Sequence, residues 1–136
     1  MVRAVKRLRK QRSNLHRKVG RKIARGMLTS ADRKRATELV EKGRQEYNAG
    51  LYHLAVERFE KALQLNPGHQ KALYFLGNAY YKEKRVGEAV AKWRACNERD
   101  PRSSIAGKAR RRMQHVEKAN RQLEQQLRDM EEDFLG

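Results

Sequence analysis

Apolar and small residues recur at a fixed interval through the middle of the chain. Residues 36–69 align without a gap on residues 70–103, an offset of 34 positions. The coinciding pairs are Leu39/Leu73, Gly43/Gly77, Tyr47/Tyr81, Ala55/Ala89, Val56/Val90, Phe59/Trp93 and Pro67/Pro101. A period of this length is typical of helical hairpins that stack on one another. The pattern therefore predicts an all-α fold in which residues 31–103 form two helix-turn-helix repeats.

The paired positions have physical reasons to coincide. Gly43 and Gly77 let the two helices of a hairpin approach closely, and the large rings of Phe59 and Trp93 fill the space beside them. Each repeat closes on an Asn-Pro or Asp-Pro step, and the residue before a proline is driven out of the helical region. The second helix of each hairpin should therefore end at this step.

These residues resemble the tetratricopeptide repeat family. The resemblance is carried by Leu-Gly-Asn-Ala-Tyr-Tyr-Lys at 76–82 and Glu-Lys-Ala-Leu-Gln-Leu-Asn-Pro at 60–67. Lys42 and Glu46 stand where the family prefers apolar residues, and Lys84 stands where a turn glycine is common, which indicates a looser first repeat. The resemblance implies a non-enzymatic helical adaptor that binds other macromolecules.

In this family, the first helices of successive repeats line a groove that binds peptides. The resemblance implies a protein-binding groove formed by Val40, Arg44, Tyr47 and Asn48 in the first repeat and Tyr74, Asn78, Tyr81 and Lys82 in the second. Val40 and Arg44 replace the lysine and asparagine with which some members clamp a chaperone carboxylate, so that ligand is not expected. The groove could instead hold the protein's own arm or tail.

Residues 104–136 are predicted to form one long helix that caps the last hairpin, with Ser103 or Ser104 as its N-cap. Its apolar positions alternate in steps of four and three and define a coiled-coil-like seam: Met113, Val116, Asn120, Leu123, Leu127 and Met130, continued by Ala109 and Phe134 at the two ends. Asn120 at an a position is typical of a parallel two-stranded coil. The seam either binds a partner helix, from a second copy as a homodimer or from another protein, or packs on the repeats or the arm of its own chain.

Residues 1–30 form a basic arm. Residues 1–35 carry 14 Lys and Arg against Asp32, which accounts for +13 of the net charge of +17. A helical stripe of Val5, Leu8, Leu15, Val19, Ile23 and Met27 is weakened by two glycines, so a partly helical arm is expected that orders on a polyanion. The predicted nucleic-acid-binding residues are Arg3, Lys6, Arg7, Arg9, Lys10, Arg12, Arg17, Lys18, Arg21, Lys22 and Arg25.

Nucleic acid is the expected partner of the arm, because Lys and Arg gain affinity for phosphates through counterion release. Only His16 could stack on a base, so contacts should be to the backbone of structured RNA. The arm resembles the extensions with which ribosomal proteins enter folded RNA, which favours RNA over DNA. The alternatives are a solvated tail, an anionic membrane surface, an acidic protein surface or an organelle transit peptide.

Catalytic chemistry is not expected. The four histidines and the single cysteine, Cys96, have no metal-like spacing, and no nucleophile elbow, phosphate-binding loop or zinc motif occurs. Cys96 takes the position of Ala62 in the first repeat and should lie in the core. No metal, cofactor or small-molecule substrate is therefore predicted.

The sequence favours a cytoplasmic scaffold, with an organelle matrix as the minor option. No apolar run approaches the length of a membrane span. The basic arm would anchor the protein to RNA in a ribonucleoprotein particle, with the ribosome as the candidate, while the repeats or the tail contact protein. The alternative is an adaptor in a protein-only or membrane-surface assembly.

Overall fold

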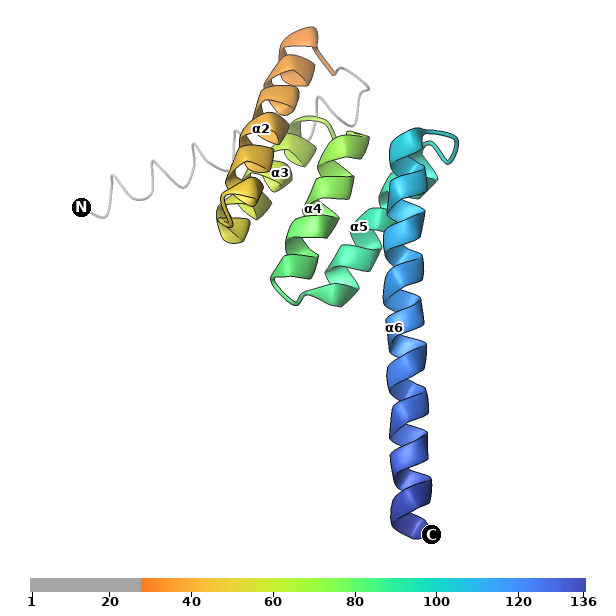
Figure 1. The fold of residues 1–136 in the computed structure, drawn as a ribbon. Helices are drawn as coiled ribbons and strands as arrows, with labels where there is room; N and C mark the ends of the chain where they lie inside the picture. The colour runs from red at the N-terminus through yellow and green to blue at the C-terminus, as the bar shows by residue number, and fades with distance from the viewer. Residues whose placement is uncertain (1–27) are drawn as a thin grey trace, which may run out of the picture.

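A computed structural model describes residues 28–136 of the chain (Figure 1). These residues form α2 (Ser30–Asn48), α3 (Tyr52–Leu65), α4 (Gln70–Lys82), α5 (Val86–Arg99) and α6 (Ser104–Leu135), and no strand occurs within this range. Helices α2 and α3 form the first hairpin, α4 and α5 form the second, and α3 packs on α4. The predicted all-α fold of stacked hairpins is confirmed. The cations predicted to bind nucleic acid, Arg3 to Arg25, lie outside the described residues.

Side-chain caps fix where three helices begin. Thr29 and Asp32 form a reciprocal capping box at α2, in which the Asp32 amide donates to Thr29 Oγ1 at 3.0 Å. The imidazole of His69 accepts from the Ala72 amide at 3.2 Å and caps α4. Of the two serines expected to cap α6, Ser103 does so, accepting from the Ala106 amide at 3.1 Å.

Each hairpin has the same close contact in its core, between a glycine and an aromatic ring. A Cβ built on Gly43 would lie 2.6 Å from Cε1 of Phe59, and one on Gly77 would lie 2.5 Å from Nε1 of Trp93. Both rings are fully buried. The predicted packing is confirmed, because the glycines let the two helices approach closely and the rings fill the space beside them.

The turns of the two hairpins have the same backbone conformation but different residues. Gly50 has a φ of +80° and Lys84 has a φ of +66°. Only glycine adopts this left-handed region without a steric penalty. The second turn therefore keeps the geometry of the first at a small cost in free energy.

The polar departures of the first repeat lie at an end of the stack. Lys42 is exposed, whereas Leu76, its counterpart one period later, is fully buried against the preceding hairpin. Glu46 is largely covered and accepts from Arg58 Nε at 3.1 Å. Among the described residues, only α3 and α4 pack against α2, so no helix covers the outer face of α2. The polarity of Lys42 therefore reflects its position at the end of the stack, whereas Glu46 is covered and is paired with Arg58.

Helix α6 takes the place of the first helix of a third repeat. It packs on α5 and α4 as α4 packs on α3 and α2. Ala106 lies one period after Ala72, and both are fully buried. The side chain of Gln70 joins these elements, because its Nε2 lies 3.0 Å from the Cys96 carbonyl oxygen and 3.0 Å from Ser103 Oγ.

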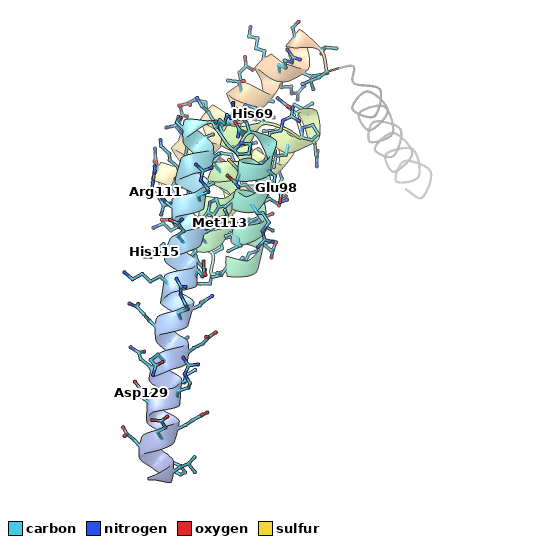
Figure 2. All side chains as sticks on the ribbon, turned by 90° about the vertical axis from the view of Figure 1, so that its right-hand side faces the viewer. His69, Glu98, Arg111, Met113, His115 and Asp129 are labelled. Carbon is cyan, nitrogen blue, oxygen red and sulfur yellow. The ribbon has the colours of Figure 1, made fainter. Side chains whose placement is uncertain are left out.

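The second half of α6 leaves the repeats. Val116 is the last buried residue, and every residue from Glu117 onward is exposed. In Figure 2, Met113 lies level with the repeats, whereas Asp129 lies on the part of the helix that projects past them. The two interpretations of the seam thus apply to different parts of it: its beginning packs on the repeats, and its end has no partner within residues 28–136.

Candidate protein-binding face and helix seam

The residues predicted to line the groove lie on α2 and α4, but they differ in accessibility. Val40, Tyr74 and Asn78 are buried, Arg44, Tyr47 and Tyr81 are partly buried, and Asn48 and Lys82 are exposed. Trp93 Nε1 donates to Asn78 Oδ1 at 3.2 Å, so this amide is engaged inside the second hairpin. We call the surface that these helices form with α6 the α2–α4–α6 face. Its accessible part lies around the partly buried and exposed members.

Arg44 is held on this face by two neighbours. Its guanidinium lies over the ring of Phe75, 4.8 Å from the centroid. Its Nη1 also lies 3.5 Å from Glu41 Oε2 on the same helix. A planar cation stacked on an aromatic ring remains available at its edges for hydrogen bonds. Arg44 therefore presents a positioned donor to a ligand.

Helix α6 adds Arg112 and Lys108 to the same face. Burial alone would raise the pKa of Tyr74, but the nearby guanidinium of Arg112, together with Asn78 and the charge of Lys108, lowers it instead. An Arg from the capping helix therefore reaches the phenol of the second repeat. The sequence-based set missed Arg112, although it stands one period after Asn78 and two periods after Arg44.

Tyr47 extends the cluster to the first repeat. Its ring makes an edge-to-face contact with Tyr52 at a centroid distance of 5.3 Å. Burial raises the pKa of Tyr47, and the positive charge of Arg112 opposes that rise. The first repeat, the second repeat and α6 thus meet around Arg112. The resulting surface combines the partly buried ring of Tyr47 with positive charge, above the buried ring of Tyr74.

A second feature lies where α6 leaves the repeats. A pocket of about 330 Å³ is lined by residues of α5 and α6: Val90, Arg94, Met113, Val116, Glu117 and Asn120. We call it the junction pocket. Beyond it the seam residues are uncovered, with exposed fractions of 55% for Leu123, 51% for Leu127, 67% for Met130 and 90% for Phe134.

The described residues show little that could perform covalent chemistry. Cys96 is fully buried, as predicted, and burial raises the pKa of its thiol to about 11. A thiol in this state is a poor nucleophile. Residues 28–136 hold no cluster of three or more His, Cys, Asp or Glu side chains arranged to bind a metal. Within the same range, no helix combines the length and the apolar character that crossing a bilayer requires.

Comparison with known proteins assigns the repeats to a family. The family model of the tetratricopeptide repeat matches residues 40–102. This segment is therefore a tetratricopeptide-repeat unit, as the sequence motifs indicated, and the fold of α2 to α5 agrees with it. Among curated proteins, no sequence matches the chain significantly. The repeat unit indicates a scaffold for protein interactions.

Proposed function

We propose that this tetratricopeptide-repeat protein is a non-enzymatic adaptor that joins an acidic protein segment, bound on the α2–α4–α6 face, to RNA bound by the basic arm. The observation that carries the first half is the placement of Arg112 beside Tyr74 and Tyr47. Three helices contribute to one cationic and aromatic surface, with Arg44 from α2 and Lys108 from α6. Such a surface suits carboxylates that alternate with apolar side chains.

The second half of the proposal is supported by the placement of charge along the sequence. Residues 1–35 hold +13 of the net +17, and nine of the 14 cations are arginines. Arginine makes forked contacts with phosphate oxygens. We expect the arm to bind the backbone of folded RNA in a ribonucleoprotein particle, and the ribosome is the leading candidate. Projection of the tail away from the repeats leaves it accessible to a helical partner.

Peptide selection tests the protein-binding half. Peptides would be selected from a random display library on the intact chain, and their affinities measured with Arg112→Gln and with Arg111→Gln as the control. Arg111 is an exposed neighbour on the same helix, so both changes remove one positive charge. We expect the selected peptides to be acidic. Their affinity should fall at least about tenfold for the Arg112→Gln variant and should not change for the Arg111→Gln variant. Equal losses in both variants would reduce the effect to net charge.

A salt series tests the RNA-binding half. Affinity for a folded RNA would be measured with the intact chain and with a variant lacking residues 1–27, which retains the Thr29 cap of α2. If six to ten phosphates are engaged, affinity should fall by about 10³ to 10⁵-fold between 50 and 200 mM salt. Equal binding by the truncated variant contradicts a role for the arm. Binding to anionic vesicles that exceeds binding to RNA would point to a membrane surface instead.

A further inference from the structure

The exposed end of the seam is a continuous apolar surface. Leu123, Leu127, Met130 and Phe134 follow one another along the side of α6 that, nearer its start, packs on α5. An isolated helix gains little stability from its own hydrogen bonds, and most helices depend on a packed apolar face. A partner helix is therefore expected along residues 117–135.

The position of α5 excludes a parallel second copy of α6. In a parallel coil the partner would lie along the whole seam in register, including the part around Ala109, Met113 and Val116. That part is already covered by α5 of the same chain. Because α6 is one unbroken helix from Ser104 to Leu135, the partner could not diverge before reaching α5. The parallel arrangement suggested by Asn120 alone conflicts with this packing.

An antiparallel second copy meets this obstacle only at its end, where its Phe134 would lie level with the covered Val116. In that arrangement a positions of one helix face d positions of the other. With a two-fold axis at Gln125, the facing pairs are Leu123 with Leu127, Asn120 with Met130, and Val116 with Phe134. Every exposed seam residue gains a counterpart. The repeats of the second copy then begin beside the C-terminal end of the first copy's α6, away from the first copy's own repeats.

The junction pocket fits the end of this arrangement. Phe134 of a second copy would lie level with Val116, beside the pocket of about 330 Å³ that Val90 and Met113 help to line. Arg94 stands at the same pocket. Phe134 is flanked by Asp133 on its own chain, so its ring would meet the apolar side chains of Val90 and Met113 while the carboxylate lies at a pocket that holds both Arg94 and Glu117.

Charge along α6 also favours the antiparallel direction. Residues 104–121 carry six Lys and Arg and one Glu, whereas residues 122–136 carry one Arg and five Asp and Glu. In the register centred on Gln125, the acidic residues 122–136 lie level with residues 114–128 of the other copy, which carry three Lys and Arg against two Glu. Parallel pairing would instead set the two acidic ends side by side.

We propose that two copies of this chain associate through residues 117–135 of α6 as an antiparallel pair, with Phe134 of each copy seated in the junction pocket of the other. This inference depends on the proposed adaptor function only in that it names the helical partner of the tail. Dimerisation and binding by the arm or the α2–α4–α6 face involve separate residues, so each is measured on its own.

Sedimentation equilibrium of the intact chain tests the association. We expect a dimer at tens of micromolar for the wild type and a monomer for Leu127→Asp. Gln125→Asp is the matched control, because it adds the same charge on the outer side of the helix and should leave the dimer intact. Both side chains are exposed in the monomer, so neither change should unfold the repeats. A monomeric wild type overturns the proposal.

Disulfide formation tests the direction. Asn120→Cys and Glu124→Cys would each be introduced in the full chain together with Cys96→Ala, which restores the residue found at Ala62. In the antiparallel pair, the two copies of position 124 lie about 3 Å apart along the axis and the two copies of position 120 about 15 Å apart. We expect rapid dimer cross-linking of Glu124→Cys and not of Asn120→Cys. The opposite result establishes a parallel pair and overturns the proposal.

A failed adaptor function gives a different pattern. If the chain dimerises but binds neither folded RNA nor acidic peptides, the proposal for α6 stands and the proposed function falls. If RNA binds and the wild type is monomeric, the reverse holds.

Discussion

The two repeats have the same packing inside their hairpins, but their outer faces are covered to different extents. Within each hairpin, a glycine meets an aromatic ring: Gly43 with Phe59 and Gly77 with Trp93. On their outer faces they differ, because the second repeat is covered on both sides by α3 and α6, whereas α2 contacts only α3 and α4 among the described residues. A repeat sequence therefore encodes both the hairpin and its place in the stack.

The outer face should show the largest difference between the repeats. Leu76→Ala removes a fully buried side chain between the hairpins and should destabilise the protein by about 3 kcal/mol. Lys42→Ala, at the equivalent position on α2, should change the free energy of unfolding by less than about 0.5 kcal/mol. Urea unfolding of both variants checks this. Similar losses would mean that an unobserved contact covers Lys42.

The glycine contacts should instead make the repeats behave alike. Gly43→Ala and Gly77→Ala each place a methyl group within 3 Å of a buried ring, and each should destabilise the protein by about 1 to 3 kcal/mol. Gly107→Ala on α6 is the control, since the nearest atom to its new Cβ, Arg110 Nη2, lies 3.6 Å away. That change should stabilise the helix by up to about 1 kcal/mol. Thermal melts of the three variants suffice.

Acid should distinguish the caps of the two repeats. Burial, with help from the charge of Lys71, lowers the pKa of His69 below its ordinary 6.5, and the neutral ring accepts the hydrogen bond that caps α4. The contribution of His69 is therefore complete above pH 6.5 and declines as the pH falls below it. We expect the loss to reach up to about 1 kcal/mol, the usual contribution of an N-cap, once the ring is protonated. His69→Asn should remove this part of the pH dependence, whereas the Thr29 cap of α2 does not titrate there.

The turns should give the smallest effect. Lys84→Gly relieves a side chain at a φ of +66° and should stabilise the protein by about 0.5 to 1 kcal/mol. Gly50→Lys, the reverse change in the first turn, should destabilise it by about 1 kcal/mol. Denaturation midpoints of the pair measure both. A gain from Gly50→Lys would contradict the conformational argument.

The hairpins could be predicted from the sequence because their determinants are local and repeated. A glycine, a ring 16 positions later and a closing proline recur in both repeats, and each acts on its immediate neighbours. The N-cap of α6 is also a local feature, so the sequence limits it to two adjacent serines. The arm's cations lie outside the described residues, and their role stays a prediction.

Other features depend on how distant elements meet. The apolar residues of the seam have the same spacing before and after Val116, so the pattern does not indicate where α5 stops covering α6. Arg112 reaches Tyr74 only because α6 docks like the first helix of another repeat. Three of the residues expected to line the groove, Val40, Tyr74 and Asn78, are buried, since a periodic position can serve packing as well as binding.

The unbroken course of α6 also sets a length. In the antiparallel register, the two junction pockets would be held about 27 Å apart, since 18 residues of helix separate Val116 from Phe134. Each dimer would then present two identical α2–α4–α6 faces at a separation set by this length of helix. A target offering two sites at that span would gain avidity by raising the effective concentration of the second contact, with no change in either site.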